Sequence, residues 1–142
     1  MTDNAGSPSS LATVLYAAAD LIWATKIKGT GDAIGIACRP VRSLDMLEAR
    51  LADTDVRGLI LDLDAAALAF ELLARVRASR STPRDQSIRV VAFGPHVAVD
   101  LLQRAQAEGA SAVLARGAFG AQLPAILRAL TAGTPVASKM DD

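Results

Sequence analysis

The chain has 142 residues, the size of a single domain, which argues against an enzyme with separate cofactor and substrate domains. Its apolar content of 51% is enough for a buried core. The 15 basic residues balance the 15 acidic residues, so neither nucleic acid nor an anionic membrane is an expected partner. One cysteine and one histidine cannot form an internal disulfide or a zinc site of thiolates and imidazoles, and we expect no metal and no cofactor.

The two ends of the sequence are predicted to be flexible tails around one domain. The first, residues 1–11, is polar over residues 1–10 and resembles no signal peptide, so we expect a cytoplasmic protein. Charged residues interrupt every apolar run before the roughly 20 residues that a membrane-spanning helix needs. The domain is expected over residues 12–132, and the second tail over residues 133–142.

Apolar periodicity predicts an alternation of strands and helices along the chain. The strands are expected at residues 12–18, 36–39, 56–63, 88–93 and 111–115. The helices are expected at residues 21–34, 44–51, 68–76, 97–108 and 122–130, with a polar loop over residues 79–87. Asp20 and Ser43 are suited to cap the first two helices, and Gly35 and Gly109 to end the first and the fourth.

Repeated strand–helix units with right-handed crossovers predict an α/β protein with a doubly wound parallel sheet and helices on both faces. Five units in a chain of this size favour the flavodoxin-like strand order 2-1-3-4-5, with the Rossmann order as the alternative. The stretch 56–63 is apolar on both faces, so it is the expected central strand. Ligand sites in such sheets lie beyond the carboxyl ends of the strands, so the residues there are the first candidates for function.

The predicted strand ends carry a distinctive set of residues, namely Ala18-Ala19-Asp20, Asp62-Leu63-Asp64, Gly94-Pro95-His96 and Arg116-Gly117. The layout resembles the response-regulator receiver domain over residues 13–130, with Leu59-Ile60-Leu61-Asp62-Leu63 similar to the phosphoacceptor strand of that family. The resemblance implies that Asp62 stands at the acceptor position. It also implies a magnesium-binding acidic pair after the first strand, a serine or threonine after the fourth and a lysine after the fifth.

The chain departs from that pattern at each supporting position. The acidic pair falls on Ala18 and Ala19, which leaves only the following Asp20. The hydroxyl position falls on Gly94, and the lysine position on Arg116. Because a hard divalent cation needs several oxygen ligands, magnesium affinity should be poor and phosphoryl transfer impaired. The sequence therefore resembles a degenerate receiver, or pseudo-receiver.

Asp62 has two interpretations. In the favoured one it forms an ion pair with Arg116 that fixes the carboxyl edge of the sheet, because the guanidinium fork suits bidentate contact with a carboxylate. In the other it still accepts a phosphoryl group. The ion pair predicts that Asp62→Ala lowers thermal stability.

Four further residues near the strand ends are candidates for binding. Trp23 and Lys26 of the first helix could join Arg116 in binding an anion or a partner's acidic side chain, the alternative being a ring beside a solvated charged face. His96 is expected to have a loop or interface role. Phe119 is expected to present an apolar surface on the face of the fourth helix, fifth strand and fifth helix, where the resemblance implies that partners bind.

Two other features have structural interpretations. Cys38 lies in an apolar strand and is expected to be a small core residue. Gly29 and Gly31 precede a strand, which is the wrong end for a dinucleotide-binding loop, so we expect them to serve helix packing.

These observations predict a non-enzymatic, stand-alone receiver-like module that binds another signalling protein without regulated aspartyl phosphorylation. The sequence does not decide whether the chain also forms a homodimer. One alternative is an atypical receiver that accepts a phosphoryl group on Asp62. Another is a small-ligand or anion-binding protein that uses the strand ends near Lys26, Asp62, His96 and Arg116.

Overall fold

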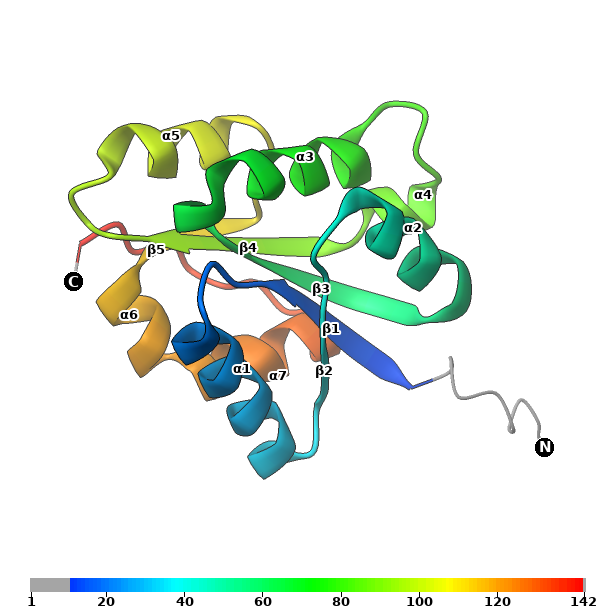
Figure 1. The fold of residues 1–142 in the computed structure, drawn as a ribbon, viewed down its shortest axis with the longest axis horizontal. Coiled ribbons are helices and arrows are strands. Elements are labelled where there is room, and N and C mark those ends of the chain that lie inside the picture. The colour runs from blue at the N-terminus through cyan, green and yellow to red at the C-terminus, as the bar shows by residue number, and fades with distance from the viewer. Residues whose placement is uncertain (1–10, 142) are drawn as a thin grey trace.

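Five parallel strands form one sheet in the computed structural model, which describes residues 11–141 (Figure 1). Residues 1–10 of the tail predicted at residues 1–11 lie outside the described part. The strands are β1 Ala12–Ala17, β2 Ala37–Pro40, β3 Asp55–Asp62, β4 Arg89–Gly94 and β5 Ala112–Ala115. Their order is β2-β1-β3-β4-β5, with β3 paired to β1 on one side and β4 on the other. The flavodoxin-like order and the central position of β3 are therefore confirmed.

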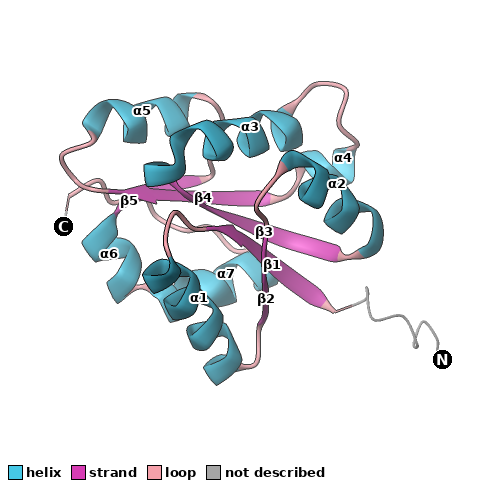
Figure 2. Ribbon diagram, viewed as in Figure 1, coloured by secondary structure: helices cyan, strands magenta, loops and turns pink. Residues whose placement is uncertain are grey.

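Helices cover both faces of this sheet (Figure 1 and Figure 2). One face carries α2 Leu44–Asp53, α3 Ala66–Arg77, α4 Pro83–Gln86 and α5 Val99–Ala107. The other face carries α1 Leu21–Ile34, α6 Arg116–Ala121 and α7 Leu123–Ala132. Along β3, Leu59 and Leu61 join the core under the first set, while Ile60 joins the core under the second. Burial on both sides explains why this strand is an unbroken apolar run.

The predicted helix ends are present. Asp20 and Ser43 each accept a hydrogen bond from the backbone N–H three residues further on, at 2.9 and 3.0 Å. Gly35 and Gly109 have φ angles of 77° and 111°, in the left-handed region where glycine carries no Cβ penalty. These local signals fix where α1, α2 and α5 begin or end.

Two short helices were not predicted. In the expected polar loop over residues 79–87, the Thr82 hydroxyl accepts the Asp85 N–H at 3.1 Å, and Pro83 occupies the first turn of α4. The second is α6, which begins at Arg116, directly after β5. Helices of one or two turns are too short to show a 3.6-residue repeat, which is why periodicity missed them.

Within the segment predicted as a flexible tail, residues 133–142, Lys139 instead pairs with β5. Lys139 donates its N–H to the Val113 carbonyl at 2.9 Å and accepts an N–H from β5 at 2.7 Å. The Ser138 hydroxyl accepts the Val113 N–H at 3.0 Å, and Met140 packs against the core. The reason is that the outer edge of β5 exposes unpaired N–H and C=O groups, which this segment satisfies.

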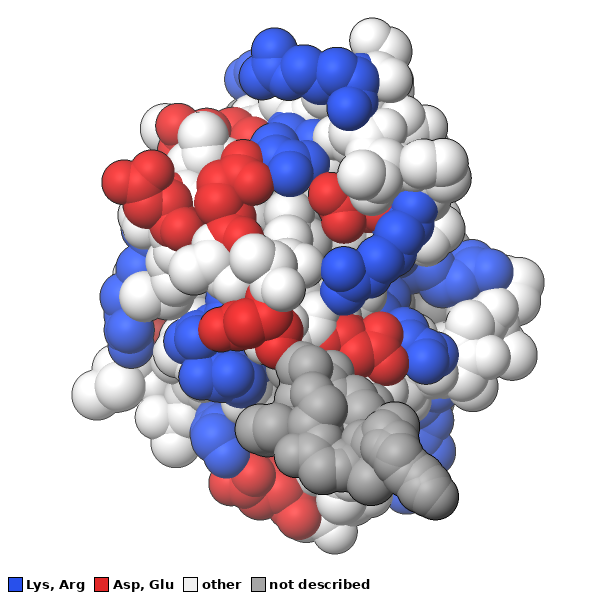
Figure 3. Space-filling model, turned by 90° about the vertical axis from the view of Figure 1, so that its right-hand side faces the viewer, with Lys and Arg blue, Asp and Glu red and all other residues white. Residues whose placement is uncertain are grey.

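Within residues 11–141, no helix is long and apolar enough to cross a bilayer. Figure 3 shows the face at the right-hand side of Figure 1, where acidic and basic side chains are interspersed and neither sign covers the surface alone. A phosphate backbone therefore finds no continuous basic surface on this face.

Candidate functional site

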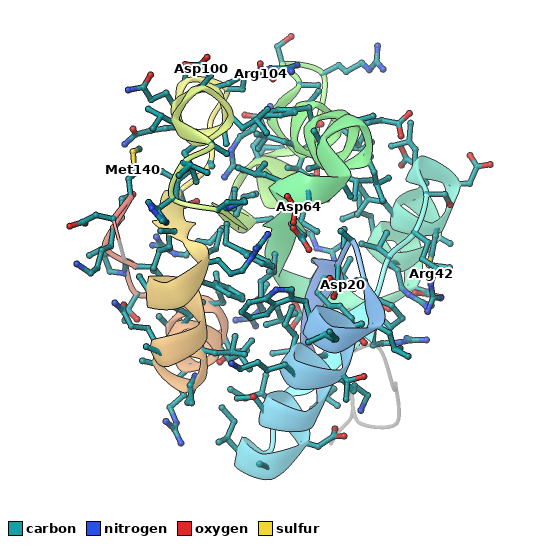
Figure 4. All side chains as sticks on the ribbon, turned by 60° about the vertical axis from the view of Figure 1, so that its left-hand side comes forward. Asp20, Arg42, Asp64, Asp100, Arg104 and Met140 are labelled. Atoms are coloured by element: carbon teal, nitrogen blue, oxygen red, sulfur yellow. The ribbon has the colours of Figure 1, made fainter. Side chains whose placement is uncertain are left out.

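The carboxyl ends of the strands carry the residues selected from the sequence. Asp62 ends β3, Gly94 ends β4, Asp20 follows β1, and Arg116 follows β5. Figure 4 turns this edge toward the viewer, with Asp20 at the start of α1 and Asp64 just after β3. The fold therefore gathers the predicted positions at one edge of the sheet.

Asp62 is buried, with 1% of its surface exposed. Its Oδ2 accepts the N–H of Ala19 at 2.9 Å, and its Oδ1 accepts the N–H of Asp64 at 3.0 Å. Ala19 lies in the β1–α1 turn, and Asp64 lies in the short 3-10 helix η2, Leu63–Ala65. Each carboxylate oxygen thus ties one turn to the end of β3.

Burial raises the pKa of Asp62 above the ordinary aspartate value of 3.8, and the hydrogen bonds from the Ala19 and Asp64 amides oppose that rise. The nearby Asp64 carboxylate raises the pKa further, and the Arg116 guanidinium lowers it least of all these causes. The charged form of Asp62 is therefore held mainly by backbone amides.

Arg116 forms its ion pair with Asp64, so the predicted ion pair between Arg116 and Asp62 is wrong. The Asp62 oxygens are turned toward backbone amides inside the protein, whereas Asp64 is exposed and reaches the guanidinium. Arg116 donates through Nη2, while its buried Nε has no hydrogen-bond partner among the described residues. The arginine still joins the β3–α3 connection to α6, but through the second aspartate of the motif.

The residues at this edge do not fit the magnesium site that the resemblance implies. Ala18 and Ala19 stand where the acidic pair would supply oxygen ligands. Asp20 uses Oδ1 to cap α1, and Asp64 is paired with Arg116. In the described part of the chain, no group of three or more histidine, cysteine, aspartate or glutamate side chains is arranged to hold a metal ion.

Gly94 occupies the position where the resemblance implies a hydroxyl. It is buried, and a Cβ built on it would lie 3.3 Å from the Cβ of Leu63. A serine or threonine would therefore press on the turn that follows β3, and the packing fits glycine.

Three of the four predicted binding candidates, Trp23, Lys26 and His96, line one hollow of about 430 Å³ between α1, the β4–α5 loop and α6, which we call the edge hollow. Arg116 lines it with them. The Lys26 ammonium lies over the Trp23 ring, with Nζ 5.1 Å from the ring centroid. The structure thus brings together side chains that the sequence placed on three separate segments.

Phe119 is fully buried, so the prediction of an apolar contact surface at this residue is wrong. Its ring stacks on Phe93 with centroids 4.0 Å apart, and Trp23 packs on Phe119 at 5.5 Å. The reason is that α6 turns Phe119 inward, so its ring supports the inner side of the edge hollow.

Cys38 is a core residue, as predicted, and burial raises the pKa of its thiol to about 11. A thiol with that pKa is a poor nucleophile at neutral pH. Gly31 packs against it, because a Cβ on Gly31 would lie 2.5 Å from the Cys38 Sγ. The packing role of this glycine is therefore confirmed.

Sequence reasoning missed two residues of the site. Asp64 stands in the motif that was singled out, but its neighbour Asp62 was preferred as the partner of the arginine. Gly120 lets Trp23 and Lys26 approach α6, since a Cβ there would lie 3.3 Å from both Trp23 Cη2 and Lys26 Nζ. Nothing in the sequence pointed to this role of Gly120, because α6, which carries it, was not predicted.

No model of a known protein family matches the chain, and no curated protein matches its sequence. Solved structures do match. A response regulator from Hahella chejuensis aligns with a TM-score of 0.67 and 20% identity, over 83% of this chain and 93% of its own. The chemotaxis response regulator CheY4 of Vibrio cholerae aligns with a TM-score of 0.67 and 16% identity, over 84% of this chain and 98% of its own. The non-phosphorylated receiver domain of the stress response regulator RcsB from Escherichia coli aligns with a TM-score of 0.68 and 16% identity, over 91% of this chain and 99% of its own.

These similarities show that the chain has the receiver fold of response regulators. Sequence identities of 16% and 20% establish a shared fold but not a shared function, because one fold serves many functions.

Proposed function

We propose that the chain is a non-enzymatic signalling module that binds another protein and does not undergo magnesium-dependent aspartyl phosphorylation. The receiver fold supports a signalling role, because the solved structures that share it are response regulators. The departures from the receiver pattern at the strand ends support the loss of phosphorylation.

The burial of Asp62 carries this proposal. An oxygen of Asp62 that attacks a phosphodonor must first give up the N–H of Ala19 or Asp64 and reach solvent. Both hydrogen bonds are partly buried, and breaking either one costs about 0.5–1.5 kcal/mol before any chemistry begins. The ground state therefore holds this carboxylate as a structural link between two turns.

The surroundings of Asp62 also lack what phosphoryl transfer needs. That reaction depends on positioning and on neutralising the charge that spreads over the phosphoryl oxygens. Ala18 and Ala19 offer no metal ligands, and the nearby cation Arg116 is already paired with Asp64. An incoming phosphoryl group would therefore meet the carboxylate charge of Asp62 and Asp64, with no metal ligands from Ala18 or Ala19 and with Arg116 already shared.

Phosphodonor labelling tests the proposal. We expect no magnesium-dependent mass increase when the full chain is incubated with acetyl phosphate and analysed by intact-mass spectrometry. A receiver that accepts phosphate from the same donor, run in parallel, shows that the conditions suffice. A magnesium-dependent adduct on the natural chain would overturn the proposal.

Two variants identify the acceptor if an adduct forms. Asp62→Asn removes the family acceptor position, and Asp64→Asn removes the exposed carboxylate beside it. Loss of the adduct in Asp62→Asn alone would establish the atypical receiver as the correct reading. Loss in Asp64→Asn alone would move the acceptor to a residue that the resemblance does not select.

A further inference from the structure

Large apolar side chains are exposed at the carboxyl edge of the sheet. Leu21 and Ile22, at the start of α1, are 79% and 76% exposed, and Val97, just before α5, is 75% exposed. Val99 is also exposed, so four of the five exposed large apolar residues identified in the described part of the chain lie at this edge. Surface apolar residues grouped around a depression are typical of a binding surface.

The edge hollow lies between these two segments. Its lining includes Trp23 and Lys26 from α1, Val97 from the β4–α5 loop, and Arg116 and Gly120 from α6. None of its lining residues carries a carboxylate, whereas two carry permanent positive charge. The hollow therefore combines apolar walls with a cationic side.

Lys26 is the cation available to a ligand. Its ammonium rests over the Trp23 ring, and no described carboxylate forms an ion pair with it, whereas Arg116 is engaged by Asp64. Trp23 is itself held in place by Phe93 and Phe119, with ring centroids 5.0 and 5.5 Å away. The ring and the ammonium are thus organised before any partner arrives, which lowers the entropy lost on binding.

We propose that the edge hollow binds a peptide segment of a partner protein that carries one carboxylate flanked by apolar side chains. The carboxylate pairs with Lys26, and the apolar side chains lie on Trp23, Ile22 and Val97. The inference rests on the proposed function, since it gives the protein-binding module a surface and its partner a chemistry.

The local charges favour this partner over other anions. A doubly charged phosphate group needs more than one free cation, and Arg116 is shared with Asp64, while Asp20 also lies at this edge. An anionic bilayer attracts proteins through clusters of several basic residues, whereas the lining of the edge hollow has only two permanent cations, Lys26 and Arg116, and Arg116 is paired with Asp64. A single carboxylate matches a single available ammonium.

A peptide selection tests the proposal directly. The full chain is immobilised and screened against a display library of random 12-residue peptides, and binders are resynthesised. Trp23 is the only tryptophan in the chain, so its fluorescence reports binding at the hollow without a label. We expect enriched peptides with an acidic residue between apolar ones that change Trp23 emission; no enrichment, or enrichment without an acidic residue, overturns the proposal.

Charge variants on one helix sharpen this test. Lys26→Gln should weaken the selected peptides about tenfold, the expected effect of losing one charge-assisted hydrogen bond. Lys28→Gln is the matched control, because Lys28 lies on the same helix but is paired with Asp32 at 2.6 Å. Its affinity should stay within about twofold of the natural chain. Equal affinities for the two variants would contradict the role of Lys26.

Two glycine variants test the shape of the hollow. A Cβ at Gly120 would lie 3.3 Å from Lys26 Nζ and Trp23 Cη2, so Gly120→Ala should displace both and weaken binding about fivefold. Gly29→Ala is the control, because a Cβ there meets nothing within 4 Å. Unchanged peptide affinity in Gly120→Ala would contradict the proposal that the peptide binds in the edge hollow.

The outcomes separate this inference from the proposed function. Magnesium-dependent phosphorylation of Asp62 together with Lys26-dependent peptide binding would overturn the proposed function alone. No phosphorylation and no peptide binding would overturn the inference alone.

Discussion

The two ends of the sheet are built differently. At the amino end, arginine side chains hold the loops through many backbone and carboxylate contacts. At the carboxyl edge, the hydrogen bonds of Asp62 and the exposed Arg116–Asp64 pair lie beside an open hollow and exposed apolar side chains. From this difference we infer a division of roles, in which the amino end contributes more to stability and the carboxyl edge is the proposed binding side.

Arg77 shows how the amino end is held. Its Nε donates to the Gly109 carbonyl at 2.8 Å, and its Nη1 donates to the carbonyls of Gln86 and Ile88 at 3.0 and 2.8 Å. Burial lowers the pKa of Arg77, so these bonds offset the cost of removing its charge from water. One side chain thereby joins the end of α3 to the loops before β4 and β5.

Arg75 adds a second link at the same end. It forms two hydrogen bonds with the Glu48 carboxylate, at 2.5 and 2.9 Å, and contacts the mostly buried Asp85 at 3.4 Å. Arg84 donates to the carbonyls of Leu51 and Thr54 at 3.1 and 2.6 Å. Together these bonds connect α2, α3 and α4.

Removal of the Arg77 side chain should have the largest effect on stability. Arg77→Ala leaves three loop carbonyls without their donor, and we expect the free energy of unfolding to fall by about 3 kcal/mol. Urea denaturation measures the change. Arg57→Ala, also at the amino end but exposed and paired only with Asp55, is the control and should change stability by about 0.5 kcal/mol or less. Equal losses in the two variants would contradict the proposed division of roles.

Asp62→Ala should have an intermediate effect, about 1–2 kcal/mol at neutral pH, because it leaves the Ala19 and Asp64 amides unpaired while removing a buried charge. The pKa of Asp62 is raised in the folded protein, so its contribution to stability is fully present below the unfolded pKa and is lost as pH rises through the folded pKa. The deficit of the variant should therefore grow as pH is lowered toward 4. Urea denaturation of the natural chain and of the variant from neutral pH to about pH 4 measures this difference in the free energy of unfolding. If the difference instead becomes smaller at low pH, the pKa of Asp62 is lowered in the folded protein and not raised.

Arg116→Ala should have the smallest effect on stability, about 0.5 kcal/mol or less, because its pair with Asp64 is exposed. Asp64→Ala is the matched variant, and the double variant completes a double-mutant cycle. Thermal melts of the four proteins give the coupling energy. A coupling of several kcal/mol would mean that the carboxyl edge is held as firmly as the amino end.

The sequence predicted the architecture because local signals agreed with one another. The caps at Asp20 and Ser43, the left-handed glycines and the two-sided apolar run of β3 each restrict one element, and together they leave one strand order favoured. The site was harder to predict. The choice between Asp62 and Asp64 depends on which way two carboxylates two residues apart are turned, and residue spacing carries no information on that.

The predictions for Phe119 and for the carboxyl-terminal segment were wrong for a related reason. The resemblance suggested a contact surface around Phe119, but α6 turns the ring onto Phe93, where burial of a large aromatic surface is favourable. Residues 133–141 have the composition of a loop, and only the presence of an open edge at β5 makes their pairing favourable. Such long-range choices depend on the assembled sheet and not on local pattern.

The pairing of Lys139 with β5 has a consequence for handling and turnover of the protein. A protease that clips the chain after α7 would uncover the amides of Val113 and Ala115, which Ser138 and Lys139 now satisfy. Unpaired amides at a strand edge can pair with a strand of a neighbouring molecule, so we expect the clipped protein to aggregate more readily than the full chain.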